Sequence, residues 1–236
     1  MNIVVMLAGG TGERMGAGRP KQYIEIGSKP LIIHCLEVFE QSPDIDAIEI
    51  VSHKDWIDHV KQLVRQYNIT KVRWICEGGD TCQISTRNGI FNLEGKVSDD
   101  DVLMFAMSSS PFVTNDIIKD SLRVCKEHGN AFACLQSKYN LAFSEDGISS
   151  VKINFKEKNK TVNMPWTSTF GKLDKAYHYA FEKGIETEVA SYMPTLWLAL
   201  GERLYFSKDT STNLLHATYA EDLKIFEAVL GIENRL

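Results

Sequence analysis

The chain has 236 residues, of which 44% are hydrophobic and 24% charged, a composition typical of a globular protein with a core of useful size. Its net charge of −5 at pH 7 argues against nucleic acid or an anionic membrane as a main partner. The five cysteines form no CxxC pair, and the first apolar run is too short for a signal peptide, so we expect reduced thiols and a cytoplasmic location.

Apolar runs of strand length alternate with segments of helical period in the first 135 residues. We predict strands at 3–7, 47–51, 72–76, 102–107 and 131–135, and helices at 30–41, 54–67, 81–93 and 115–128. This alternation predicts a mostly parallel sheet with helices on both faces. Ligands of such sheets bind beyond the carboxyl ends of the strands. The loops at 7–21, 52–55, 77–85 and 107–114 should therefore face one crevice, with the acidic run 99–101 in a solvated loop at the opposite edge.

The pattern changes in the second half of the chain. Residues 138–163 are polar, rich in lysine and alternate over short stretches, which predicts an arm of antiparallel β-hairpins outside the core. Beyond it we predict helices at 172–183, 187–200 and 220–230, with a short strand at 204–207. We expect residues 1–236 to form a single domain with this β-arm as an excursion.

The loop LAGGTGERMGAGRPKQY, residues 7–23, indicates a phosphate-binding site, and two common motifs do not describe it. A P-loop requires lysine directly after its closing glycine, and neither Gly16 nor Gly18 is followed by one. A dinucleotide fingerprint requires a third glycine where Met15 stands, and no acidic residue ends the second predicted strand. A dinucleotide-dependent oxidoreductase is therefore disfavoured.

A third interpretation uses the whole loop. Gly9, Gly10 and Gly12 can expose consecutive N–H groups to the oxygens of a polyphosphate. Arg14 and Lys21 add a planar guanidinium and a compact ammonium. Two cations beside an α-phosphate suit in-line attack, because negative charge grows on the equatorial oxygens.

The residues LAGGTGERM…RPKQY, followed by PLIIH and Phe39, resemble the opening of the cytidylyltransferases that act on 2-C-methyl-D-erythritol 4-phosphate and ribitol 5-phosphate. The resemblance implies a three-layer, Rossmann-like nucleotidyltransferase fold, CTP as substrate and Mg²⁺ as cofactor. It gives Arg14 and Lys21 the catalytic role of stabilising pentacoordinate phosphorus. A tryptophan at the position of Trp56 is frequent in the ribitol branch. The positions that the resemblance assigns to nucleotide binding are Leu7, Ala8, Gly9, Gly10, Thr11, Gly12, Gly79, Asp80 and Ser85.

The acceptor side departs from the family pattern. Pro111-Phe112-Val113 fixes the register of the fourth-strand motif, which places Met107 where the family has its Mg²⁺-binding aspartate and Ser110 where it has an arginine. Methionine does not suit Mg²⁺, which prefers oxygen ligands. In the base loop, Cys82 replaces the usual arginine. The acceptor-side candidates are Ser108, Ser109, Ser110, Thr187, Glu188 and His216, the last at the position of a family lysine, and the metal ligands stay unassigned.

We therefore predict an enzyme that transfers CMP from CTP to a polyol or sugar phosphate such as ribitol 5-phosphate, releasing pyrophosphate. By resemblance, its CDP-linked product feeds cell-surface polysaccharides. A CTP-binding homologue with little or no turnover is the first alternative, and the intact pair Arg14 and Lys21 argues against it. A 2-C-methyl-D-erythritol 4-phosphate cytidylyltransferase of isoprenoid synthesis is the second. The resemblance also implies a homodimer through the β-arm, in which lysines could replace the missing arginine; these are Lys152, Lys156, Lys158 and Lys160.

Overall fold

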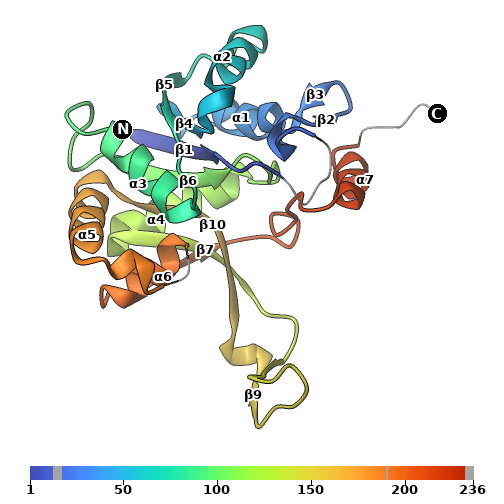
Figure 1. Ribbon diagram of the computed structural model, residues 1–236, viewed down its shortest axis with the longest axis vertical. Coiled ribbons are helices and arrows are strands. Elements are labelled where there is room, and N and C mark those ends of the chain that lie inside the picture. Colours follow the sequence, from blue (N-terminus) through green and yellow to red (C-terminus); the bar gives the residue numbers. More distant parts are fainter. Residues whose placement is uncertain (13–17, 190, 232–236) are drawn as a thin grey trace.

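A central sheet of seven strands organises the computed structural model, which describes residues 1–12, 18–189 and 191–231. The strand order is β11-β7-β10-β6-β1-β4-β5 (Figure 1). Strands β6, β1, β4 and β5 are parallel, while β10 is antiparallel to both neighbours, so the predicted mostly parallel sheet is confirmed. The strands are β1 (Asn2–Ala8), β4 (Ala47–Ser52), β5 (Val72–Glu77), β6 (Val102–Met107), β7 (Asn130–Gln136), β10 (Lys160–Thr169) and β11 (Phe206–Lys208).

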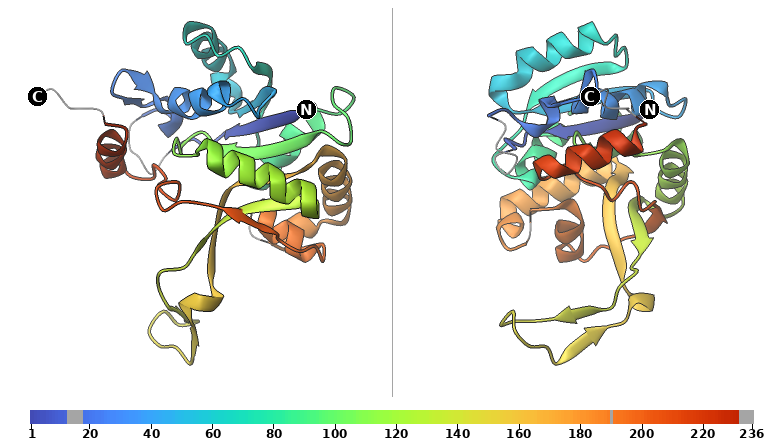
Figure 2. Two further views of the ribbon diagram at one scale, coloured as in Figure 1. Left: turned by 180° about the vertical axis from the view of Figure 1, so that it is seen from behind. Right: turned by 90° about the vertical axis from the view of Figure 1, so that its right-hand side faces the viewer.

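Helices cover both faces of the sheet, as the alternating pattern predicts (Figure 2). One hydrophobic core lies under α1 (Leu31–Gln41), α2 (Ile57–Gln66), α4 (Asn115–His128) and α7 (Ala220–Val229). The second lies under α3 (Cys82–Asn92), α5 (Phe170–Lys183) and α6 (Met193–Ala199). Along β1, Val4 and Met6 enter the first core while Ile3 and Val5 enter the second, which explains why this strand is apolar throughout.

Short elements complete the described fold. A two-stranded hairpin, β2 (Glu25–Ile26) and β3 (Lys29–Pro30), leads into α1. Single 3-10 turns occur at η2 (Lys21–Tyr23), η3 (Lys54–Trp56), η4 (Lys156–Lys158) and η5 (Ile185–Thr187). No helix within the described residues has the length and apolar character needed to cross a bilayer.

The sequence prediction is wrong at three places. The antiparallel strand β10 was not predicted beyond the arm, because its irregular register around Pro165 hides a strand pattern. The helix expected at 187–200 begins only at Met193, since Pro194 is accommodated in the first helical turn and not further inside. Asp101, expected in a solvated loop, is 7% exposed and accepts a hydrogen bond from the Ser98 N–H at 2.8 Å.

Between β7 and β10 the chain projects from the body of the molecule (Figures 1 and 2). This segment contains an antiparallel pair, β8 (Leu141–Phe143) and β9 (Lys152–Asn154), and the turn η4. Its charged residues are exposed, as the sequence predicts, and so are several large apolar side chains: Tyr139, Leu141, Phe143, Ile148, Val151, Ile153 and Phe155.

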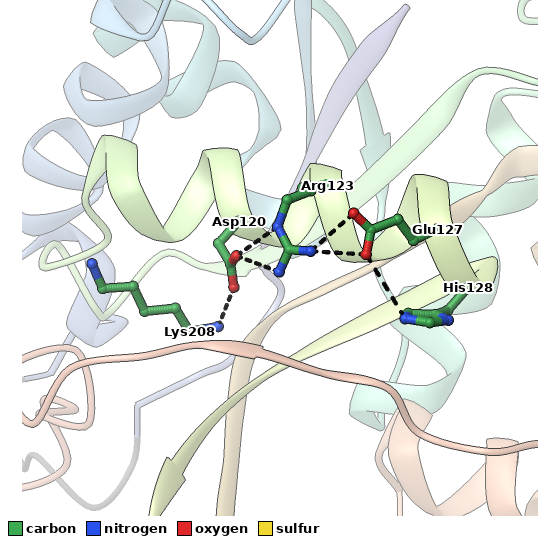
Figure 3. A network of polar contacts seen from close by, with 5 residues as sticks. All are labelled: Asp120, Arg123, Glu127, His128 and Lys208. Carbon is green, nitrogen blue, oxygen red and sulfur yellow. Dashed lines mark hydrogen bonds and ion pairs between the residues drawn. The ribbon is translucent and has the colours of Figure 1, made fainter.

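Strand β11 at the sheet edge is fastened to α4 by a polar network (Figure 3). The Asp120 carboxylate accepts a hydrogen bond from the Lys208 N–H at 2.7 Å. Arg123 donates to Asp120 at 2.8 Å and to both carboxylate oxygens of Glu127, at 2.8 and 2.9 Å. Because Lys208 is the last residue of β11, this network fixes where the following segment leaves the sheet.

One buried acid makes the fold sensitive to pH. Glu49 on β4 is fully buried, and burial raises its pKa from 4.5 to about 8. Asn92 of α3 donates to Oε1 at 2.6 Å, while Oε2 is buried without a hydrogen-bond partner. The folded chain therefore holds a proton that the unfolded chain releases between about pH 4.5 and 8, so stability falls as the pH rises through this window.

Replacing Glu49 by glutamine should stabilise the chain at pH 8 by on the order of 3 kcal/mol and remove the pH slope, because Gln keeps the acceptor for Asn92 and carries no charge. The free energy of unfolding in urea at pH 5.5 and at pH 8 measures this. Glu40→Gln is the control and should destabilise, since Glu40 accepts hydrogen bonds from the N–H groups of Thr70 and Lys71. The prediction would be contradicted if the free energy of unfolding changed by the same amount between pH 5.5 and pH 8 in wild type and in Glu49→Gln.

Candidate nucleotide site

The carboxyl ends of four parallel strands are in register and form one edge. Ala8 of β1 is paired with Ser52 of β4, and Ser52 with Glu77 of β5. On the other side, Leu7 of β1 is paired with Met107 of β6. The loops that follow these strands therefore leave the sheet side by side, as predicted for the crevice.

A cavity of about 470 Å³ lies at this edge. It connects the loop after β1 with the loop after β5, and the loop after β4 lies between them. Seven of the nine predicted nucleotide-binding positions line it, and Ala8 and Gly12 are not among the lining residues. The complete lining is Leu7, Gly9, Gly10, Thr11, His53, Lys54, Glu77, Gly78, Gly79, Asp80, Thr81, Cys82, Ser85 and Met107.

The loop after β5 is built around the Ser85 hydroxyl. Ser85 Oγ accepts a hydrogen bond from the Gly79 N–H at 3.0 Å and lies 3.2 Å from the Gly79 carbonyl oxygen, to which it can donate. A Cβ atom on Gly79 would lie 2.1 Å from Ile84 Cγ2, so the loop requires glycine there. The Thr81 hydroxyl caps α3 by accepting from the Ile84 N–H at 3.1 Å. The result is a rigid polar rim that can read a base through backbone groups and one hydroxyl.

The glycine loop is held in place by a buried glutamine. Gln22 is 1% exposed and donates from Nε2 to the carbonyls of Ala8 at 2.8 Å and Gly10 at 3.0 Å. With these carbonyls turned toward Gln22, the loop can present N–H groups to the cavity. Tyr23, the next residue, is 3.2 Å from Ser52 Oγ and stacks on Trp56 with ring centroids 4.6 Å apart.

Lys21 connects the glycine loop to the C-terminal part of the chain. Its Nζ donates to the Ala217 carbonyl at 2.8 Å. Gly12 has a φ of +71°, and a Cβ atom there would lie 2.5 Å from the Lys21 backbone N. Gly12 and Lys21 are therefore in close backbone contact. Arg14, the other predicted catalytic residue, lies outside the described residues.

The acceptor-side candidates lie in two groups. Ser108, Ser109 and Ser110 are buried directly after β6, and Ser110 Oγ is 3.2 and 3.1 Å from the carbonyls of Asn213 and Leu215. These carbonyls belong to residues 209–217, a segment between β11 and α7 that we call the strap. The strap also carries His216, whose Nε2 lies 3.0 Å from Asn163 Oδ1.

Thr187 and Glu188 lie beyond the end of α5. Thr187 Oγ1 donates to the Gly184 carbonyl at 2.7 Å, and Glu188 ends the turn η5. Among the contacts of the described residues, none joins either residue to Ser110 or His216. Their neighbour Tyr192 reaches the same edge of the sheet, because its carbonyl accepts a hydrogen bond from Gln83 of α3 at 3.2 Å.

His216 and Cys82 are uncharged at neutral pH. Burial lowers the pKa of His216, and the nearby Lys21 ammonium lowers it further. Burial raises the pKa of the Cys82 thiol to about 11. The two positions where the family resemblance expects lysine and arginine therefore carry no positive charge. Among the described residues that line the cavity, Lys54 supplies a positively charged side chain.

Sequence reasoning missed several residues of this edge. Gln22 gave no signal beyond its place in the loop, and only its buried contacts show that it holds the loop. The loop 52–55 was expected at the crevice, but His53 and Lys54 were not among the predicted site residues, and both line the cavity because they follow β4 directly. His216 contacts Asn163, which in turn donates to Asp209 and to the Asn213 carbonyl, and nothing in the spacing of these residues indicates the contacts.

Comparison with known proteins supports the resemblance of the sequence. Residues 2–232 match the family IspD, 2-C-methyl-D-erythritol 4-phosphate cytidylyltransferase. The 4-diphosphocytidyl-2C-methyl-D-erythritol synthase of Anaerococcus prevotii superposes over 98% of both chains with a TM-score of 0.80 at 17% identity, which shows the fold.

Two relatives show a closer likeness in sequence. The ribitol-5-phosphate cytidylyltransferase of Lacticaseibacillus paracasei is 31% identical over 230 residues, 98% of each chain. The 2-C-methyl-D-erythritol 4-phosphate cytidylyltransferase of Clostridium perfringens is 30% identical over 225 residues, 95% of this chain and 96% of its own. The match of the family along nearly the whole chain, together with these relatives, places the chain in the IspD family of cytidylyltransferases.

Proposed function

We propose that this protein transfers CMP from CTP to a phosphorylated polyol, with ribitol 5-phosphate as the first candidate. The observation that supports this proposal most strongly is that one continuous cavity joins the glycine loop to the loop around Ser85. Such a cavity suits a nucleotide whose phosphates lie over Gly9, Gly10 and Thr11 and whose base meets Gly79 and Ser85. The relative that matches along 98% of both chains is a ribitol-5-phosphate cytidylyltransferase, which supports this acceptor.

In the proposed reaction, an oxygen of the acceptor phosphate attacks the α-phosphorus of CTP. A new P–O bond joins CMP to the acceptor, the bond from the α-phosphorus to the bridging oxygen breaks, and pyrophosphate leaves with the bonding electrons. Charge grows on the non-bridging oxygens of the α-phosphate, where a fixed cation is most effective. We assign Lys21 this role, since the Ala217 carbonyl orients its ammonium, and we keep Arg14 as its partner on the resemblance.

We propose Mg²⁺ as the cofactor, which would neutralise phosphate charge during the transfer. The donors of the cavity suit this hard cation only in part. Glu77 and Asp80 offer carboxylate oxygens, whereas Met107 offers sulfur. The phosphates and water would supply the remaining oxygens, as is usual for Mg²⁺ bound with a nucleotide.

The acceptor side favours recognition through hydrogen bonds. Apart from the Glu188 carboxylate, its described candidates are hydroxyl groups and a neutral imidazole, which suit the several hydroxyls of a polyol. These groups supply no positive charge for the phosphate of the acceptor. We propose that a lysine of the arm supplies it. We propose a homodimer in which the arm of one protomer covers the other, because the arm exposes Phe143, Ile153 and Phe155 without a partner in the described chain.

We further propose that residues 1–236 act as one cytidylyltransferase domain with residues 138–163 as its arm. A cytoplasmic location suits its free thiols and its nucleotide substrate. The CDP-linked product would serve as a donor for cell-surface polysaccharides.

Replacing Ser85 by alanine should raise the Kd for CTP about tenfold, because the Gly79 N–H and carbonyl lose their shared partner at the rim that meets the base. Isothermal titration with CTP measures this. Thr86→Val is the matched control, since the Thr86 hydroxyl donates to the Cys82 carbonyl within α3 at 2.8 Å. An unchanged Kd in Ser85→Ala, or an equal loss in the control, would remove Ser85 from base recognition.

The proposed function is tested by mixing the protein, CTP and Mg²⁺ with a panel of phosphorylated polyols and sugars and following pyrophosphate release. Ribitol 5-phosphate should support release, and the product should contain a CDP-linked polyol. Release with 2-C-methyl-D-erythritol 4-phosphate alone would favour the isoprenoid reaction. Silence across the panel with measurable CTP binding would favour the non-catalytic homologue.

A further inference from the structure

A cluster of buried polar side chains from the strap and from β10 lies outside the cavity lining. Asp209 is 6% exposed, Asn163 7% and Asn213 1%. The Asp209 carboxylate accepts hydrogen bonds from Asn213 Nδ2 at 2.8 Å, from Asn163 Nδ2 at 3.2 Å and from the Thr210 N–H at 2.8 Å. All three contacts use it as an acceptor, with no cation among them. A buried carboxylate held in this way specifies the orientation of both carboxamides.

The orientation of the Asn163 carboxamide determines which ring nitrogen of His216 carries the proton. Asn163 Nδ2 faces two acceptors, Asp209 and the Asn213 carbonyl at 2.9 Å. Its Oδ1 is therefore the atom that faces His216 Nε2, at 3.0 Å. A carboxamide oxygen only accepts, so Nε2 must carry the proton. His216 Nδ1 is then the bare nitrogen, and it is buried without a hydrogen-bond partner in the described structure.

The same strap positions Lys21. Ala217, the residue after His216, accepts the Lys21 ammonium at 2.8 Å and donates its N–H to the Ser109 carbonyl at 3.3 Å. Ser110 Oγ lies 3.1 Å from the Leu215 carbonyl on the other side of His216. The imidazole and the carbonyl that receives Lys21 are therefore parts of one hydrogen-bonded unit, and a change at Asp209 reaches both.

We propose that Asp209 is a positioning residue for cytidylyl transfer: through Asn163 it fixes the Nε2–H form of His216, and through the strap it sets the carbonyl that aims Lys21. This inference rests on the proposed function for its effect on turnover. It adds a buried residue outside the cavity lining, which acts through Asn163, the carboxamide that contacts His216.

Asp209→Asn tests the proposal with almost no change in shape. The new amide NH₂ must face the NH₂ group of Asn163 or of Asn213, and two donors cannot pair. If Asn163 rotates to offer its oxygen, its NH₂ turns toward His216 Nε2. The imidazole must then move its proton to Nδ1, where no acceptor stands, or lose the bond. Either outcome disturbs the strap.

The experiment combines ¹⁵N NMR of labelled histidine and lysine with steady-state kinetics. In wild type, His216 should be the Nε2–H tautomer. In Asp209→Asn that signature should change, the Lys21 Nζ resonance should shift, and kcat should fall about tenfold while the Kd for CTP changes less than twofold. Ser121→Ala is the matched control, because Ser121 shares a buried hydrogen bond of 2.7 Å with Thr167 on β10, and neither side chain bonds to a strap residue in the described structure. It should leave kcat and both signals unchanged.

A second variant tests rescue. Combining Asp209→Asn with Asn163→Asp places the carboxylate between the Asn at 209 and His216 Nε2–H, and both can donate to it. The rescue is partial, because the swap removes the hydrogen bond from Asn163 Nδ2 to the Asn213 carbonyl at 2.9 Å. This double variant should recover the Nε2–H signature and part of kcat. If Asp209→Asn alone changed the tautomer of His216 but kept a normal kcat, the positioning role would be overturned. An Nδ1–H tautomer of His216 in wild type would overturn it as well.

The failure of the proposed function would look different. In that case wild type releases no pyrophosphate with any acceptor of the panel. The NMR signals then decide the structural claim alone. Changes in the ¹⁵N signals of His216 and Lys21 in Asp209→Asn, but not in Ser121→Ala, support the structural claim. If these signals do not change in Asp209→Asn, the claim is overturned.

Discussion

Replacing Lys21 by alanine is expected to lower kcat by about 10²–10³-fold while changing the Kd for CTP by only a few fold. The reason is that charge on the α-phosphate grows in the transition state, so a cation fixed beside it acts more strongly there than in the bound ground state. The Ala217 carbonyl holds Lys21 Nζ at 2.8 Å and keeps the ammonium in one direction. Single-turnover pyrophosphate release and CTP titration separate the two effects.

Lys71→Ala is the matched control for this substitution. Lys71 also donates its ammonium to a backbone carbonyl, that of Ser42 at 2.6 Å, and it lies away from the cavity. It should leave kcat unchanged at saturating CTP. Equal losses in kcat and in CTP affinity for Lys21→Ala would show that Lys21 only binds the nucleotide, which is the behaviour of a non-catalytic homologue.

Gly12→Ala is expected to lower kcat/KM for CTP by about 10²-fold or more, from backbone strain and a displaced Lys21 together. The new Cβ atom would lie 2.5 Å from the backbone N of Lys21, and the φ of +71° disfavours any side chain. Backbone atoms cannot move aside as a flexible side chain can. The loop must therefore open at the point where it meets Lys21.

Gly18→Ala separates the two causes. Gly18 has a similar φ of +68°, but its added Cβ would meet no atom of the described residues within 4 Å. This variant should show only the cost of a positive φ, about 1 kcal/mol. Equal effects of the two substitutions on kcat/KM would mean that the contact between Gly12 and Lys21 does not matter for the reaction.

Much of the fold could be predicted from periodicity. The strand Val102–Met107 and the helix Asn115–His128 were predicted with their observed bounds, because a fully buried strand and an amphipathic helix give strong local patterns. Strand β10 was missed because it pairs with β6 and β7 over long sequence separations and contains Pro165 in an irregular register. Such pairing is set by tertiary contacts and leaves a weak local signal.

The proposed nucleotide side of the site was also accessible from sequence, since Gly9, Gly79 and Ser85 are brought together by the backbone and by local turns. The acceptor side was not. His216 was expected to stand in for a lysine, yet burial and Lys21 lower its pKa and leave it uncharged. Its partner Asn163 lies 53 positions earlier in the chain. Contacts of that kind depend on where the strap meets β10, which no local motif encodes.

A crystal structure of the protein with CTP and Mg²⁺ tests the central claim most directly. It should show cytosine against the Gly79 and Ser85 backbone and hydroxyl groups, the triphosphate over the glycine loop, and Lys21 Nζ within hydrogen-bond distance of the α-phosphate. An empty cavity at saturating CTP, or a nucleotide bound with Lys21 directed away from its phosphates, would contradict the account.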